Sequence, residues 1–172
     1  MSTSETDTWR TSQLVELSLT VRALEPEDLT DLGWSGGPEH LTAIAEVLQG
    51  CWSGDTESVV IALPNGRLVA FGAVNFRRSP DYGELWMLSV HETLQSLGLG
   101  TVLIRALEAR VRDRGLHRAQ LGVEHDNPRA YRLYRALGYR DCGSRVEHWP
   151  AAGGNTYVTV CTVMEHRLTD TV

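Results

Sequence analysis

Apolar residues along the chain follow two different spacings in turn. Alternating or short continuous apolar runs, bounded by glycine, proline or polar residues, are typical of strands. These runs lie at 14–24, 58–63, 67–76, 82–90, 118–123, 139–149 and 156–168. Between the second and third runs, Asn65-Gly66 predicts a tight hairpin turn, because this pair readily supplies a positive φ.

Four segments between these runs predict helices. They cover 25–32, 38–50, 99–115 and 127–139. The second is closed by Gly50, and the third repeats apolar residues on one face before it ends at Gly115. The fourth begins with Asn127 as N-cap before Pro128 at the first helical position.

The order of these elements, β-α-α-β-β-β-α-β-α-β-β, predicts an α/β domain with a mixed sheet. No repeat or linker divides the chain, so residues 13–170 are expected to form one domain. The polar, acidic start, 1–12, predicts a flexible arm and not a secretory signal. No apolar run approaches the roughly 20 residues that span a membrane, so we expect no membrane partner.

Charge and cysteine content limit the classes of ligand and the cellular setting that we expect. The net charge of −6 argues against a nucleic-acid partner. Residues 1–99 hold 14 acids and 5 arginines, and 100–172 hold 8 acids and 11 arginines. A cation on the first half and a polyanion on the second is one interpretation, and ordinary solvated faces is the other. The 3 cysteines lack metal-ligand spacing, which favours a reducing, cytoplasmic setting without a metal site.

Two glycines precede the longest predicted helix, in the stretch QSLGLG at 95–100. Glycine in a helix costs about 1 kcal/mol relative to alanine, so the bare backbone is expected to have a use. A helix start presents free N–H groups and partial positive charge to a phosphate. A dinucleotide fingerprint would need glycine at Leu103, and a Walker loop would need lysine, which the chain lacks. A strand-to-helix turn with incidental glycines is the plain alternative.

Together with a second motif, this stretch resembles the GNAT superfamily of N-acetyltransferases. QSLGLG is similar to that family's Arg/Gln-x-x-Gly-x-Gly/Ala between a strand and a long helix. NPRAYRLYRALGY at 127–139 is similar to Asn-x-x-Ala-x-x-Leu-Tyr-x-x-x-Gly-Phe/Tyr, although Glu92 upstream replaces a usual proline. The resemblance implies a single-domain GNAT-type fold. Its sheet would be mixed, mostly antiparallel, twisted and flanked by helices, and splayed between the fourth and fifth strands.

The same resemblance implies acetyl-CoA as acyl donor. Its pyrophosphate would lie on backbone N–H groups of 95–101, and its pantetheine arm on the strand end at 88–90. The amide near Val90 would polarise the thioester carbonyl, and Asn127 would approach the cofactor. The expected acetyl-CoA contacts are Leu88, Ser89, Val90, Gln95, Ser96, Leu97, Gly98, Leu99, Gly100, Thr101 and Asn127.

Two side chains are the candidate catalytic groups. Tyr134 holds the family's Leu-Tyr position, where a phenol protonates the departing thiolate, although it also lies on an apolar helical stripe. A base is needed because a lysine-type amine, with a pKa of about 10.4, is protonated at neutral pH. Glu84 matches a position where several family members carry a glutamate base. A second such position is Gly122 here, and Glu124, His125 or water are the alternatives.

The resemblance also implies that the amine acceptor lies between two loops, 33–38 and 149–157, with Trp34 and Trp149 as expected contacts. Trp52 and Trp86 would extend this aromatic wall, unless they are core or subunit contacts. The predicted activity is transfer of an acetyl group to a small-molecule or protein primary amine by direct attack in a ternary complex. A larger acyl-CoA donor and a non-catalytic acyl-CoA sensor are the alternatives. A homodimer is one option for assembly.

Overall fold

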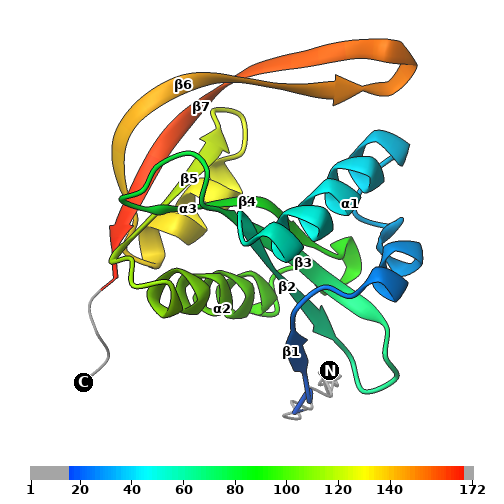
Figure 1. Ribbon diagram of the computed structural model, residues 1–172. Helices are drawn as coiled ribbons and strands as arrows, with labels where there is room; N and C mark the ends of the chain where they lie inside the picture. The colour runs from blue at the N-terminus through cyan, green and yellow to red at the C-terminus, as the bar shows by residue number, and fades with distance from the viewer. Residues whose placement is uncertain (1–15, 169–172) are drawn as a thin grey trace, which may run out of the picture.

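A seven-stranded sheet organises residues 16–168, the part of the chain that the computed structural model describes (Figure 1). The strands follow the order β1-β2-β3-β4-β5-β7-β6. β4 and β5 run parallel, and every other neighbouring pair is antiparallel. The strands are β1 (Thr20–Arg22), β2 (Thr56–Ala62), β3 (Leu68–Asn75), β4 (Gly83–Val90), β5 (Arg118–Glu124), β6 (Arg140–Ala151) and β7 (Asn155–Arg167).

Helices cover both faces of the sheet. They are α1 (Pro38–Ser53), α2 (Leu99–Asp113) and α3 (Pro128–Ala136), with the 3₁₀ turns η1 (Pro26–Leu32), η2 (Glu92–Leu94) and η3 (Ala152–Gly154). Because side chains alternate across a strand, Val59 and Ile61 on β2 pack with α2 and α3, whereas Val60 packs with η1 and α1. The predicted α/β class and mixed sheet are confirmed. None of the helices described is long and apolar enough to cross a bilayer.

β4 separates from β5 after a short paired stretch. Residues 83–85 pair with 119–121, and the remainder of β4 has no partner on that side. On its other side, Met87 and Leu88 lie opposite Gly72 alone, a β-bulge in which Met87 has φ 54°. A Cβ on Gly72 would lie 2.9 Å from Leu88 Cδ2, so the bulge needs a glycine opposite it. The predicted splay between the fourth and fifth strands is confirmed.

Several element boundaries differ from the predictions. α1 continues through Gly50 to Ser53, and Gly54, with φ 79°, forms its left-handed C-cap. Gly50 instead allows close packing on β2, because a Cβ there would lie 2.6 Å from Thr56 Oγ1. The strand expected from residue 14 begins at Thr20, and the helix expected at 25–32 is a 3₁₀ helix. The predicted arm, 1–12, lies outside the described residues.

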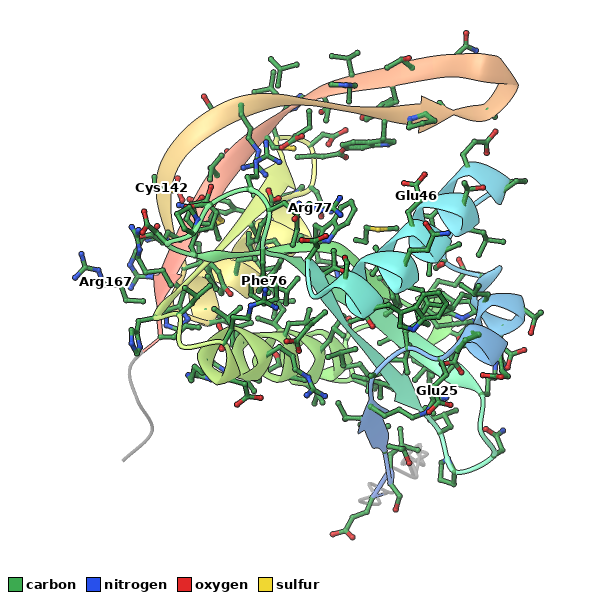
Figure 2. The ribbon with its side chains drawn as sticks, viewed as in Figure 1. Glu25, Glu46, Phe76, Arg77, Cys142 and Arg167 are labelled. Carbon is green, nitrogen blue, oxygen red and sulfur yellow. The ribbon has the colours of Figure 1, made fainter. Side chains whose placement is uncertain are left out.

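β6 and β7 form a long hairpin that arches over one end of the molecule (Figure 1). The two strands pair as far as Ala151 and Asn155, whereas β7 pairs with β5 only from Arg167 to Cys161. The outer part of the hairpin is therefore a two-stranded arm, and side chains project from both of its faces (Figure 2). Residues of this hairpin line one side of a cavity between the hairpin and the sheet.

Candidate active site

A cavity of about 580 Å³ opens where β4 separates from β5. Residues of α1, β4, β5, α3 and the β6–β7 hairpin line it. Five residues predicted for the site are among them: Glu84, Leu88, Asn127, Tyr134 and Trp149. The splay of the sheet thus brings together residues that are far apart in the sequence.

The predicted phosphate loop leads into α2. Gly98 is the N-cap with φ 85°, and a Cβ there would meet no atom within 4 Å. The first backbone hydrogen bond of α2 joins Val102 N to Gly98 O, so the N–H groups of 99–101 have no helical acceptor. Gly100 serves packing, since its Cβ would lie 3.0 Å from Leu133 Cδ2. The loop therefore has the open backbone and helix start that suit an anion.

Gln95 ties this loop to β4 and α3 through its side chain. Its Nε2 donates to Val90 O at 3.1 Å, and its Oε1 accepts from Arg129 Nη1 at 2.5 Å. Arg129 also donates to Ser96 Oγ at 3.1 Å. Arg129, which no sequence motif indicated as a site residue, adds a guanidinium beside the loop. Arginine is well suited to phosphate because its donors form a planar fork.

A second cavity, of about 470 Å³, follows the end of β4. Leu88, Ser89, Val90 and Gln95 line it, and Leu88 also lines the larger cavity. Leu88 is therefore a wall residue of both cavities. Of the residues predicted to bind acetyl-CoA, these four line the smaller cavity and Asn127 lines the larger one, and the acetyl-CoA site stays a prediction.

α3 contributes two predicted residues to the larger cavity. Asn127 Oδ1 accepts from Ala130 N at 3.1 Å, which confirms Asn127 as the N-cap. Tyr134 is 8% exposed, and burial raises its pKa to about 12. The phenol therefore keeps its proton at neutral pH. Tyr134 belongs to the core and also forms part of the cavity wall, so its role as general acid stays a prediction.

Glu84 lies in a cluster of four charged side chains. Its carboxylate is buried, and it accepts from Arg78 Nη1 at 3.1 and 3.3 Å and from Arg145 Nη2. Glu147 pairs with the same two arginines, at 3.4 Å from Arg78 Nη2 and through Arg145 Nε. Both Glu84 oxygens are therefore engaged by guanidinium groups. Its role as base stays a prediction, and these contacts favour a structural role.

Gly122 lies beneath this cluster. A Cβ there would lie 3.6 Å from Arg145 Nη2 and 3.4 Å from Cys161 Cβ. The Arg145 guanidinium thus crosses β5 over bare backbone to reach Glu84 on β4. From the sequence, Gly122 was interpreted only as a position that lacks a catalytic base. The sequence shows that position 122 has no side chain. It does not show that Arg145 from another strand passes over this position.

Glu124 ends β5 and lines the same cavity. Its Oε1 is buried and has no hydrogen-bond partner in the described part of the chain. Burial, with a contribution from Asp126, raises the pKa of the carboxyl. A buried oxygen without a partner can accept a hydrogen bond from a bound ammonium group. His125, the other named alternative, is exposed and is not among the cavity-lining residues.

The four tryptophans proposed for an aromatic wall separate into different places. Trp86 and Trp149 line the larger cavity. Trp34 lines the smaller one, beside the end of β4. Trp52 is 73% exposed and lines neither. The expected acceptor contacts Trp34 and Trp149 are thus not in one cavity, and Trp86 takes the place beside Trp149.

The site can now be compared with known proteins. The model of the acetyltransferase (GNAT) family matches residues 21–139. The matched stretch holds the splayed strands, the glycine loop and Tyr134. The chain belongs to the GNAT family. Members of this family are acetyltransferases.

Curated relatives of this GNAT chain are named mycothiol acetyltransferases. The protein of Thermomonospora curvata is 36% identical over 85 residues, which cover 49% of this chain and 28% of the relative. The protein of an Arthrobacter species is 33% identical over 95 residues, which cover 53% of this chain and 29% of the relative. The chain thus spans less than a third of the length of these relatives.

Solved structures of low sequence identity share the fold. The ribosomal-protein-S18-alanine N-acetyltransferase of Escherichia coli has a TM-score of 0.69 at 22% identity, with 90% of this chain and 97% of that one covered. An N-acetyltransferase of Thermoplasma acidophilum in complex with coenzyme A has a TM-score of 0.65 at 16% identity. The match covers 88% of this chain and 99% of that one. At these identities the likeness shows the GNAT fold alone.

Proposed function

We propose that this GNAT protein transfers the acetyl group of acetyl-CoA to a primary amine by direct attack in a ternary complex. The observation that carries the proposal is a pair of cavities that share Leu88 as a wall residue. The smaller follows the strand end that the acyl donor would use. The larger holds a protonated phenol and an unpartnered carboxylate oxygen, and it is open to an acceptor.

The loop before α2 has the groups that a pyrophosphate needs. The N–H groups of 99–101 point out of a helix start, which contributes about 0.3–1 kcal/mol per anion contact. The absence of a side chain at Gly98 leaves room for the phosphate, and Arg129 supplies positive charge. On the β5 side, residues 88–90 have no strand partner, and apart from Val90 O, which accepts from Gln95 Nε2, their backbone groups are available to the pantetheine arm. The amide near Val90 would polarise the thioester carbonyl.

The chemical step forms a C–N bond and breaks a C–S bond. The neutral amine nitrogen attacks the carbonyl carbon, and the thiolate leaves with a proton from Tyr134. Transfer of the proton from Tyr134 to the sulfur leaves the negative charge on the buried phenolate, and a proton from the amine then neutralises it. An ammonium acceptor loses two protons overall. One passes through the base to solvent, and the other replaces the proton that Tyr134 donated.

Two carboxylates compete for the role of base. Glu84 holds the position that the family resemblance indicates, but two arginines engage its oxygens. Glu124 lies in the same cavity with Oε1 unpartnered, and its raised pKa strengthens it as a proton acceptor above that pKa. We therefore propose Glu124 as the base and Glu84 as the anchor of Arg78 and Arg145.

A panel of primary amines tests the proposed function. Each amine is mixed with acetyl-CoA, free thiol is followed, and the product is identified by mass. We expect equal amounts of thiol and N-acetylated amine for at least one acceptor. Binding of acetyl-CoA without thiol release for any amine would instead support an acyl-CoA sensor. Faster thiol release with propionyl- or butyryl-CoA would point to the larger donor.

A further inference from the structure

Buried polar atoms without partners gather around the two cavities. In residues 16–168 they are Trp34 Nε1, His40 Nε2, Trp86 Nε1, Arg112 Nε and Glu124 Oε1. Trp34 lines the smaller cavity, and three of the others belong to residues that line the larger one. A buried polar group without a partner has lost its hydrogen bonds to water and gained none in return, which destabilises the protein. A ligand in the larger cavity that pairs with these atoms would remove that destabilisation.

The charges that line the larger cavity are unequal in their pairing. Arg78 and Arg145 are both occupied by Glu84 and Glu147. Glu39 and Glu124 line the same cavity, and within the described residues neither forms an ion pair with an arginine. Burial raises the pKa of Glu124 more than the neighbouring His125 lowers it. The cavity therefore has two carboxylates free to attract a cation. Its two guanidinium groups are already neutralised.

The rest of the cavity wall is largely apolar or aromatic. Trp86 and Trp149 contribute indole rings, and Ala43, Met87 and Pro150 contribute aliphatic surface. Indole faces attract ammonium groups and also pack on rings and alkyl chains. Trp86 Nε1 is a donor only, so it would pair with an acceptor atom on the ligand, such as a hydroxyl or carbonyl oxygen.

We propose that the acceptor is a cationic amine that carries an aromatic or alkyl body and no carboxylate. Its ammonium group lies against Glu124 and its body lies between Trp86 and Trp149. This inference rests on the proposed function. An α-carboxylate on the acceptor would meet Glu39 and Glu124 without a free arginine. It would have to break the ion pairs of Arg145 to find a cationic partner, which makes amino acids the disfavoured class.

Matched pairs of amines test the inference. Phenethylamine and phenylalanine differ only in the carboxylate, as do tryptamine and tryptophan. With saturating acetyl-CoA, we expect kcat/KM to be at least tenfold higher for the amine without the carboxylate in both pairs. Calorimetric binding of each compound to the protein loaded with CoA gives a second readout that needs no turnover, and the same order of affinity is expected.

Substitutions of single carboxylates test which of them the acceptor contacts. Glu124→Gln should lower kcat/KM for phenethylamine at least tenfold, and Glu39→Gln should raise KM several-fold with little change in kcat. Glu46→Gln is the matched control, because Glu46 is exposed on α1 and is not among the cavity-lining residues (Figure 2). It should behave as the unsubstituted protein.

Equal or better turnover or binding of the amino acids would overturn this inference and leave the acetyltransferase intact. Loss of thiol release with every amine, while acetyl-CoA still binds, would instead remove the proposed function. If neither member of a pair is acetylated, the calorimetric order decides: tighter binding of phenylalanine or tryptophan, or no binding by any of the four, would overturn the inference.

Discussion

The two glycines before α2 show how one motif can combine two physical requirements. Gly98 has φ 85°, a conformation that residues with a Cβ rarely adopt, and it faces open space. Gly100 has no such torsion, but Leu133 from α3 packs where its side chain would be. The sequence indicated that bare backbone was needed at both positions. Only the structure separates the conformational need from the packing contact.

Tyr134→Phe tests the general acid. The phenylalanine keeps the packing against the core and loses the hydroxyl, so kcat should fall by about 10²–10⁴. The Kd for CoA should change little. Tyr131→Phe is the control on the same helix, because its hydroxyl bonds Asp141 at 3.0 Å and does not line the cavity. Normal turnover in Tyr134→Phe, with chemistry rate-limiting, would leave Tyr134 as a packing residue.

The pH dependence of the rate distinguishes the two candidate bases. Burial raises the pKa of Glu124, and a base acts in its deprotonated form, so the rate should rise as pH increases through that pKa. Glu124→Gln should abolish this rise. The difference in rate between the variant and the unsubstituted protein should shrink above the pKa of the amine, where no base is needed. Glu84→Gln should lower stability and keep the shape of the profile. The opposite pattern would indicate that Glu84, and not Glu124, is the base.

At the scale of elements, the bulge in β4 and the β6–β7 hairpin form the site between them. Alternation of apolar residues predicted β4 as a strand, and its bounds agree closely. The bulge was not predictable, because Met87 and Leu88 are ordinary strand residues and their irregularity depends on Gly72 in the neighbouring strand. The same holds for Arg145, whose path to Glu84 depends on Gly122 in β5.

Substitution of Gly98 tests the role of the loop that begins α2. Gly98→Glu introduces negative charge and a side chain where the pyrophosphate would lie, and it strains a positive φ. We expect CoA binding to be lost in calorimetry. Gly98→Ala separates strain from charge, and it should weaken binding less. Equal CoA affinity in Gly98→Glu would show that the loop does not bind the phosphates.

Gly72→Ala tests the packing behind the β4 bulge. Its Cβ would lie 2.8 Å from Leu107 Cδ1 and 2.9 Å from Leu88 Cδ2, and overpacking of this kind costs roughly 1–3 kcal/mol. Urea unfolding should show that loss. Because Leu88 lines both cavities, KM for acetyl-CoA should also rise. Gly143→Ala on β6 is the control, since no atom lies within 4 Å of its Cβ position. Unchanged stability in Gly72→Ala would contradict the tight fit.

At the scale of the whole molecule, element order and two motifs were enough to predict the GNAT fold. Chain-wide charge was less informative about the site. The cavity draws Glu39 and Glu84 from the acidic first half and Glu124 and Arg145 from the second. Its electrostatics depend on which of these pair with one another. That pairing is set by tertiary contacts, so the two free carboxylates could not be deduced from composition.

The central claim is direct acetyl transfer between two bound substrates. Rapid mixing of the protein with one equivalent of acetyl-CoA, with and without a saturating amine acceptor, tests it most directly. We predict one equivalent of free thiol together with one of N-acetylated amine when the acceptor is present, and no thiol without it. A burst of thiol in the absence of amine, with the acetyl group found on the protein by mass, would contradict direct attack.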